Sequence, residues 1–272
     1  MNNTTKGENN MRKFGVKLFS SNFIAQSQLA EECVNLIKDG TFDFLELMAL
    51  PDSYEDTKDK IASLVKGQMS VVIHAPHQGQ GMNTGDKDAY QNNRHLLDSA
   101  QRFADLLDSE IIILHTGYAN KGGEIEETIR QFNLIADERI AVENLPHYWA
   151  ERDRYFTGSS PQDVALIKQE TGCKFCYDFC HGICASNSFN RDKIADIKAY
   201  AALKPDMYHL CDSDWQGTQD MHGHYGEGNY DLAMLLQHTV PNAIITMETG
   251  HDMPENMQPW IKDVNYLHSL KL

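Results

Sequence analysis

Six histidine, aspartate and glutamate residues of this sequence each stand at the end of a short apolar or β-branched segment. They are His74, His115, Glu143, Asp178, His209 and Glu248. Carboxylates directed toward one point repel one another unless cations lie between them. Imidazole combined with carboxylate suits zinc, manganese or iron, whereas magnesium and calcium sites use oxygen almost exclusively. Any one of these residues could simply cap a following helix, but six in succession predict a transition-metal site.

Two short motifs add further candidate ligands. Asp178 and His181 form D-x-x-H, and Asp220 and His222 form D-x-H within the polar segment 212–231. Side chains at positions i and i+2 of an extended segment project to the same side, so one ion can bind both. His181 would complete a set of three. The alternative interpretation of 212–231 is a polar surface loop with glycine turns.

Eight apolar segments alternate with stretches of helical periodicity, and this alternation decides how the candidate ligands could meet. The expected strands are 14–19, 42–50, 70–76, 110–117, 139–146, 174–181, 205–213 and 242–250, with helices between them such as 29–40, 56–67 and 93–108. Strict alternation implies a parallel sheet, and eight units of about 30 residues close into a single (βα)8 TIM barrel of the α/β class. The six residues would then share the mouth formed by the carboxyl ends of the strands. Below them, the inward-facing positions are Val72, Ile113, Ala141, Cys176, Met207 and Thr246.

Composition and charge limit the possible domain boundaries and the classes of binding partner. Residues 1–13 are polar and are expected to be a disordered N-terminal segment, with Met11 a second candidate start, so the barrel would occupy 14–272. No apolar run approaches the roughly 20 residues of a membrane helix, and no signal peptide precedes the first strand, which predicts a cytoplasmic protein without a membrane partner. A formal net charge of −15 disfavours holding long DNA by charge alone.

The six cysteines are expected to be reduced thiols, because the sequence shows no export signal. Cys173-x-x-Cys176 resembles half of a zinc or iron–sulfur motif, and Cys180 and Cys184 lie nearby. No second pair stands elsewhere, however, and Cys176 falls on an expected strand beneath Asp178. Packed cysteines are therefore the favoured interpretation.

The motifs around the candidate ligands resemble those of AP endonuclease family 2, the endonuclease IV group of the xylose isomerase-like TIM barrels. H-L-C-D-S at 209–213 and D-M-H-G-H-Y-G-E-G at 220–228 are similar to the family motifs H-L-N-D-S and D-R-H-E-x-x-G-E-G, and I-A-V-E-N-L-P, Y-D-F-C-H and T-M-E-T-G match as well. The resemblance runs from about Phe14 to the C-terminus. It implies three zinc ions: the first on His74, His115 and Glu143, the second on Glu143, Asp178, His209 and Glu248, and the third on His181, Asp220 and His222.

The resemblance also implies a reaction. A metal-dependent, tri-zinc phosphoesterase would hydrolyse a phosphorylated sugar or a nucleic-acid-derived substrate, with Glu143 and Glu248 as the catalytic carboxylates. Two or three zinc ions are expected, with manganese or iron as substitutes. The alternative is a single-metal sugar (phosphate) isomerase or epimerase of the same superfamily, which would use only Glu143, Asp178, His209 and Glu248 and would move a proton between the two glutamates. A barrel that binds metal or carbohydrate without turnover is the non-enzyme alternative.

Departures from the family pattern bear on the substrate. Residues 77–81 read H-Q-G-Q-G, where the DNA-repair enzymes carry a bulky wedge that enters DNA. The mouth loops also hold few cations, so a small phosphorylated or sugar substrate is favoured and DNA is kept as an alternative; those cations are Lys87, Lys121, Arg152, Arg154 and Arg191. The candidate substrate contacts are His77, Trp149, Arg152 and Arg154, although segment 147–158 could instead be a helical lid packed on its own aromatics. Less central positions beside the mouth loops are Glu46, His147, His224 and His251.

Overall fold

Eight parallel strands close into a barrel in the computed structural model, which describes residues 11–119, 125–250 and 255–271. The barrel strands are β1 (Lys13–Phe19), β2 (Phe44–Met48), β3 (Ser70–His74), β4 (Ile112–His115), β6 (Ile140–Glu143), β9 (Lys174–Asp178), β10 (Met207–Leu210) and β11 (Ile244–Met247). Each pairs in parallel with its neighbours, and β1 pairs with β11 to close the ring. The (βα)8 prediction is therefore confirmed, and every expected strand overlaps an observed one, although the expected strand 174–181 ends at Asp178, where α7 begins.

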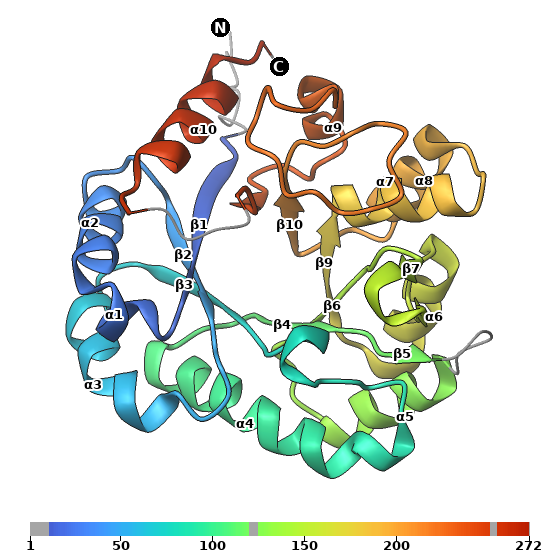
Figure 1. The fold of residues 1–272 in the computed structure, drawn as a ribbon, viewed down its shortest axis with the longest axis horizontal. Helices are drawn as coiled ribbons and strands as arrows, with labels where there is room; N and C mark the ends of the chain where they lie inside the picture. Colours follow the sequence, from blue (N-terminus) through green and yellow to red (C-terminus); the bar gives the residue numbers. More distant parts are fainter. Residues whose placement is uncertain (1–10, 120–124, 251–254, 272) are drawn as a thin grey trace, which may run out of the picture.

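Helices surround the barrel (Figure 1). They are α1 (Asn22–Ala25), α2 (Ser27–Lys38), α3 (Tyr54–Val65), α4 (Tyr90–Leu107), α5 (Ile125–Ile135), α6 (Pro161–Thr171), α7 (Phe179–Ser188), α8 (Lys193–Ala202), α9 (Leu232–Leu236) and α10 (Gln258–Ser269). The three helices predicted at 29–40, 56–67 and 93–108 correspond to α2, α3 and α4. In α2 the buried side chains recur at helical spacing, from Leu29 through Cys33 to Ile37, which places one apolar face on the barrel. No helix in the described ranges is both long and apolar enough to cross a membrane.

The predicted N-terminal segment falls mostly outside the described residues, which begin at Met11. Strand β1 begins at Lys13, one residue before the expected start of the barrel.

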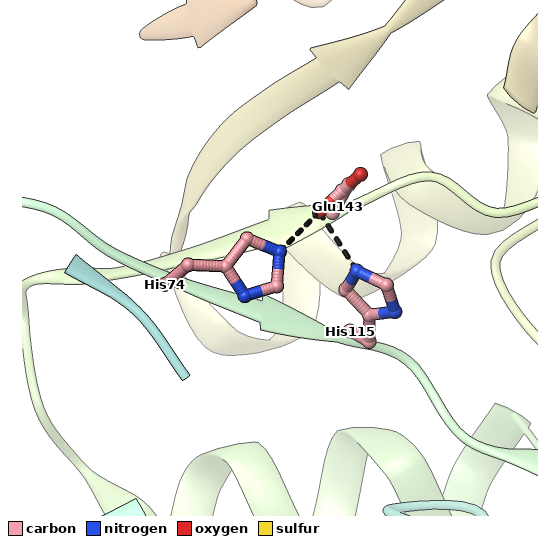
Figure 2. Close-up of side chains that lie close together, drawn as sticks. All are labelled: His74, His115 and Glu143. Atoms are coloured by element: carbon pink, nitrogen blue, oxygen red, sulfur yellow. Dashed lines mark ion pairs between the residues drawn. The ribbon is translucent and has the colours of Figure 1, made fainter. Parts of the chain in front are cut away.

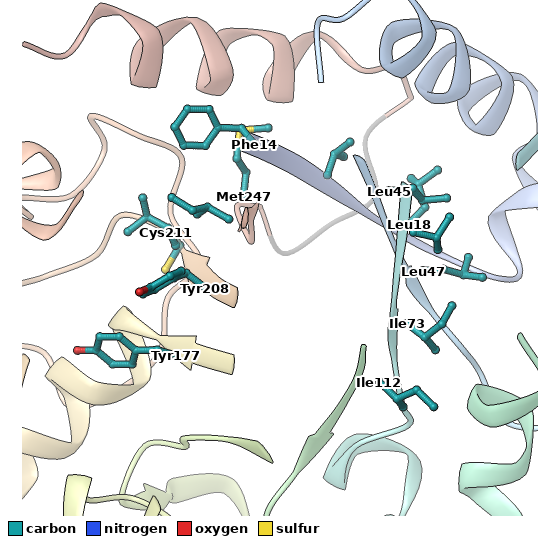
Figure 3. Packing of buried hydrophobic residues seen from close by; sticks show 14 of the residues in the cluster. Phe14, Leu18, Leu45, Leu47, Ile73, Ile112, Tyr177, Tyr208, Cys211 and Met247 are labelled. Atoms are coloured by element: carbon teal, nitrogen blue, oxygen red, sulfur yellow. The ribbon is translucent and has the colours of Figure 1, made fainter. Parts of the chain in front are cut away.

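Two apolar clusters stabilise the barrel. The larger cluster lies between strands and helices, and Figure 3 shows part of it, including Leu45, Ile73 and Tyr208. The smaller cluster fills the barrel interior with Phe44, Val72, Ile113, Ala141, Cys176 and Met207. Five of these six were expected there from strand alternation, because successive side chains of a strand face opposite sides. Phe44 reaches the interior because Gly15 leaves room: a Cβ at Gly15 would lie 2.4 Å from the Phe44 ring.

Segment 147–158 forms a small antiparallel sheet and not a helical lid. Its strands β7 (Tyr148–Trp149) and β8 (Arg154–Phe156) flank the short helix η3 (Ala150–Arg152). They pair with each other, and β8 also pairs with β5 (Tyr118–Ala119), which gives the order β5-β8-β7. Two other short helices, η1 (Gln78–Gln80) and η2 (Lys87–Ala89), lie in the connection after β3.

Candidate metal centre

The six strand-end residues lie at the same end of the barrel because all eight strands run parallel. β3, β4, β6 and β9 end at His74, His115, Glu143 and Asp178, respectively, while His209 is the penultimate residue of β10 and Glu248 directly follows β11. The strand register pairs His115 with Glu143 and His209 with Asp178 on adjacent strands. The side chains of His74, Glu143 and His209 are at most 1% exposed, so the group is almost fully enclosed.

The structure brings the nine candidate ligands together in three sets. In each set, one nitrogen or oxygen atom per residue lies within 4.8 Å of the others. In the first, the Nε2 atoms of His74 and His115 lie 3.4 Å and 3.0 Å from Glu143 Oε2 (Figure 2).

The second set surrounds the Nδ1 atom of His209. This atom lies 3.2 Å from Glu143 Oε1, 3.0 Å from Glu248 Oε2 and 3.9 Å from Asp178 Oδ2. Glu143 therefore turns one oxygen to each of the first two sets. Asp178 Oδ1 also accepts a hydrogen bond from the backbone N–H of His181, so Asp178 caps α7 as well as facing the second set.

The third set joins the start of α7 to the long loop after β10. His181 Nε2 lies 3.2 Å from Asp220 Oδ2, and His222 Nε2 contacts the same oxygen. The loop is held against the barrel by a bridge between Asp212 and Gly223, with backbone hydrogen bonds of 2.9 and 3.0 Å. These bonds place Asp220 and His222 at the barrel mouth, within reach of a helix that follows a different strand.

Each of the five histidines has one ring nitrogen anchored to an oxygen atom and the other directed at carboxylates. In a neutral imidazole, a hydrogen bond of this kind fixes the tautomer and leaves a lone pair on the opposite nitrogen, which is the usual arrangement of a metal-binding histidine. Four are anchored through Nδ1: His74 to the Ala75 carbonyl (2.7 Å), His115 to Gln78 Oε1 (2.8 Å), His181 to the Asn144 carbonyl (2.9 Å) and His222 to the Glu248 carbonyl (2.9 Å). His209 is the reverse case, with Nε2 lying 2.9 Å from Glu46 Oε2.

The buried carboxylates fit divalent cations. Glu143 Oε2 and Glu248 Oε2 are buried and accept no hydrogen bond, although imidazole nitrogens approach both. An anionic oxygen buried without a donor is costly, and a cation between it and the imidazoles would satisfy it. Mixed nitrogen and oxygen donors are the ligand types that zinc accepts.

The electrostatics keep Glu143 and Glu248 charged, whereas burial raises the pKa of Asp178 well above its usual value. Burial alone would raise the pKa of Glu143, but His115 and His209 outweigh burial and hold that pKa well below its usual range. Burial lowers the pKa of His115 to about 4, so its imidazole is neutral at pH 7 and can act as a ligand. At His222, burial would lower the pKa, but Asp220 raises it to about 10. A cation bound at these sites would compete with the proton on His222.

Sequence reasoning missed two charged residues inside the barrel. Glu46 was expected beside a mouth loop, but it lies in the middle of β2 with no exposed surface. Its Oε2 accepts hydrogen bonds from His209 and from Thr246 Oγ1 (2.6 Å), and its Oε1 lies 3.3 Å from Lys17 Nζ. Lys17, on β1, also donates to Glu248 Oε1 at 2.5 Å. The sequence signal that could have found Lys17 and Glu46 is a charged residue at an inward-facing position of the expected strands 14–19 and 42–50.

The candidate substrate contacts lie in two places. His77 lines a cavity of about 190 Å³ together with Lys17, Phe19, Met48, His222, Met247, Glu248, Thr249, Gly250 and Trp260. Trp149 instead stacks on Phe156 in the small sheet, with ring centroids 5.9 Å apart. The Arg152 guanidinium lies 5.8 Å from the Trp149 ring, and Arg154 donates to the Asp153 carbonyl. None of Trp149, Arg152 and Arg154 lines the cavity.

Other mouth residues are engaged elsewhere. His147 packs on Phe189 with ring centroids 4.0 Å apart, and His224 Nδ1 lies 2.7 Å from Asp263 Oδ2. Lys121 and His251 lie outside the described residues.

The fold and side chains together define a (βα)8 barrel with a candidate metal centre at the carboxyl ends of its strands. The chain belongs to the AP endonuclease 2 family of xylose isomerase-like TIM barrels, whose model matches residues 34–270. No curated protein matches the sequence.

Solved structures share this fold over nearly the whole chain. A D-tagatose 3-epimerase-like protein is 19% identical with a TM-score of 0.72, and the match covers 94% of this chain and 96% of the other. Endonuclease IV from Thermus thermophilus is 18% identical with a TM-score of 0.63, covering 95% and 100%. The IOLI protein with a binding zinc atom is 14% identical with a TM-score of 0.66, covering 94% and 96%. The solved structures that share this fold thus include an endonuclease and an epimerase-like protein.

Proposed function

We propose that the protein is a zinc-dependent phosphoesterase with three ions per chain that acts on a small phosphorylated sugar or a nucleic-acid-derived phosphoester. The observation that carries the proposal is the complete third set of His181, Asp220 and His222. A single-metal isomerase needs only the second set and has no use for three further ligands converging at the mouth. Zinc suits all three mixtures of imidazole and carboxylate, and manganese or iron are substitutes.

Bound divalent ions would lower the pKa of a shared water and neutralise charge that develops as a P–O bond breaks. Glu143 holds the first two sets at a fixed spacing because its two oxygens face one set each. Lys17 contacts one carboxylate oxygen of Glu248 and His209 contacts the other, so the orientation of this side chain is fixed. Glu248 also lines the cavity. It is therefore suited to orient a nucleophilic water, while His77 and Lys17 are suited to contact the substrate.

Charge favours an anionic substrate. Glu143, Asp178, Asp220 and Glu248 contribute one negative charge each, and three divalent ions would exceed them by two positive charges. Glu46 and Lys17 balance one another inside the barrel. The loaded centre would thus be a local positive site in a protein whose formal net charge is −15, and a phosphate group would be drawn to it.

The shape of the mouth supports a small substrate over duplex DNA. In segment 77–81, where a DNA wedge would be required, Gln78 instead bonds to His115 and η1 folds over the first set. The cavity of about 190 Å³ has Lys17 as its one lysine or arginine among the described lining residues. A duplex-binding surface typically neutralises about 6–10 phosphates, far more than this mouth provides.

A sugar (phosphate) isomerase or epimerase is the second candidate, because the four-residue second set is also complete. In that reaction Glu143 and Glu248 would exchange a proton with a carbon beside a carbonyl. Elemental analysis of the purified protein separates the two functions. We expect at least three ions per chain, and His222→Ala should remove one, whereas His95→Ala, at an exposed histidine of α4, should remove none. One ion per chain, unchanged in His222→Ala, would favour the isomerase.

Activity assays complete the test. The substrates are sugar phosphates, phosphodiesters and DNA with an abasic site, each with Glu143→Gln as the inactive control. We expect phosphate or alcohol release that Glu143→Gln abolishes. Ketose exchange with solvent deuterium, without phosphate release, would overturn the phosphoesterase and support the isomerase; turnover of none of them alongside tight sugar binding would indicate a non-catalytic barrel.

A further inference from the structure

Three buried thiols meet beside the third set of candidate ligands. Cys180 and Cys184 lie four residues apart on one face of α7, and Cys211 directly follows β10. All three are free thiols with at most 2% exposure, and the sulfur atoms of Cys180 and Cys211 lie within 4.8 Å of each other. Cys33 and Cys173, in contrast, lie outside this group of thiols.

A carboxylate faces this group of thiols. Asp220 Oδ1 lies 4.0 Å from Cys211 Sγ, while Asp220 Oδ2 faces His181 and His222. One ligand atom each from Cys180, Cys211 and Asp220 lies within 4.8 Å of the other two. Apolar packing explains why cysteines lie in a core, but it does not explain why a carboxylate oxygen is turned toward them.

We propose that Cys180, Cys211 and Asp220 bind a separate thiophilic divalent ion of the zinc type, next to the third set and sharing Asp220 with it. Tetrahedral zinc–thiolate bonds of about 2.3 Å separate the ligand atoms by roughly 3.8 Å, so the observed spacing needs only a small contraction. Binding displaces the two thiol protons to solvent. Two thiolates neutralise one divalent ion, which makes the site compatible with burial. Cys184 remains a buried thiol outside the ligand set.

The site would have a structural consequence for the long loop. It ties α7 to the segment that runs from Cys211 to Tyr230, whose hydroxyl lies 3.4 Å from Cys180 Sγ. Asp220 would be held from two sides, and its Oδ2 would be directed at His181 and His222. The thiol site therefore goes beyond the phosphoesterase proposal, because it stands on sulfur ligands that no hydrolytic or isomerase scheme requires.

Cobalt(II) is the probe, because thiolate ligands give cobalt an intense near-ultraviolet charge-transfer band that nitrogen and oxygen ligands do not give. Reduced, metal-free full-length protein is titrated with cobalt chloride, and bound cobalt is counted by elemental analysis. We expect the wild type to show the band. Cys211→Asn should lose the band and should bind one cobalt ion fewer than the wild type. Asparagine stands at this position of the similar family motif, so the variant is expected to fold; circular dichroism and the unfolding midpoint check this.

Matched variants decide between this site and other sources of the band. Cys33→Ser, at a buried cysteine of α2, and Cys173→Ser, at a more accessible thiol, should leave the band unchanged. Cys176 also lies within 4.8 Å of ligand atoms of Glu143 and His209, so loss of the band in Cys176→Ser and its retention in Cys211→Asn would overturn the proposal. So would a wild type without the band.

His222→Ala distinguishes the thiol site from the phosphoesterase centre. We expect this variant to keep the charge-transfer band while it loses an ion from the third set. Loss of the band in His222→Ala would show that the thiols only supplement the third set, and the separate site would be refuted. If the band behaves as expected but His222→Ala loses no ion, the thiol site stands and the three-ion phosphoesterase fails.

Discussion

Glu46 determines which nitrogen of His209 faces the second set, so we expect Glu46→Gln to weaken metal binding there. The carboxylate accepts a hydrogen bond from His209 Nε2 at 2.9 Å, which directs Nδ1 at Glu143 and Glu248 and makes it the nitrogen that gives up its proton when metal binds. Glutamine preserves the volume of the side chain but offers one acceptor and one donor. Either orientation of the amide breaks part of the arrangement.

With its oxygen toward His209, the amide places its NH2 group where Glu46 Oε1 lies 3.3 Å from Lys17 Nζ, and two donors oppose each other. With its NH2 group toward His209, Nε2 must accept, so the ring proton moves to Nδ1 and blocks the ligand lone pair. Loss of such an orienting partner typically lowers metal affinity 10–100-fold, or about 1.4–2.7 kcal/mol. We expect a loss within this range for one ion only.

The assay is zinc competition with a chromophoric chelator at neutral pH, fitted for each ion. Glu55→Gln is the control, because Glu55 is an exposed glutamate of α3 that also pairs with two cations, Lys58 and Arg102. Its zinc affinities should equal those of the wild type. Folded Glu46→Gln protein with unchanged affinity for every ion would refute the role of Glu46. If Glu46→Gln does not fold, Thr246→Val removes the hydroxyl contact to Glu46 alone and should give a smaller loss in the same direction.

Three further outcomes are expected. Arg139 lowers the pKa of Asp137 to about 2, so this carboxylate stabilises the fold above its unfolded pKa, and the stabilisation is lost as the pH falls toward 2. Asp137→Asn should therefore lower the free energy of unfolding by about 1–2 kcal/mol at neutral pH, with a smaller effect in urea titrations near pH 3; an equal effect at both pH values would contradict this. Gly117→Ala should lower the free energy of unfolding by about 2–3 kcal/mol, because the added Cβ would lie 1.8 Å from the backbone nitrogen of Gly85. An unchanged urea midpoint would show that the two segments separate easily. Removal of bound metal by a chelator should lower the melting temperature by about 5–10 °C for a site that is 100-fold saturated, measured by calorimetry with and without added zinc.

Much of the fold could be predicted because barrel strands and helices are encoded locally. A buried parallel strand reads as a short apolar run, as 70–76 and 242–250 do, and a helix on the barrel reads as an apolar stripe. Parallel connections place all carboxyl ends at one mouth, so strand-end residues could be grouped without knowledge of any distance. The gathering of the six strand-end residues required nothing more, whereas the assignment of His74, His115 and Glu143 to one set came from the family resemblance.

Segment 147–158 could not be assigned from its composition. Its aromatic and basic residues are compatible with a helical lid, a substrate-binding loop or a ribbon. The outcome depends on β8 pairing with β5, whose Tyr118 and Ala119 lie well before it in the chain. Pairing between distant segments is not visible in either segment alone.

The amino-acid sequence by itself determined the kinds of candidate ligand and the end of the barrel at which they stand, because strand order and strand direction follow from the alternation of local patterns. Tertiary structure decided which atom of each ligand faces which neighbour. Nδ1 of His209 faces the second set because Glu46 on β2 reaches across the barrel interior, a relation that depends on barrel closure. The same holds for Cys180, Cys211 and Asp220, which meet only because the loop after β10 folds back against the start of α7.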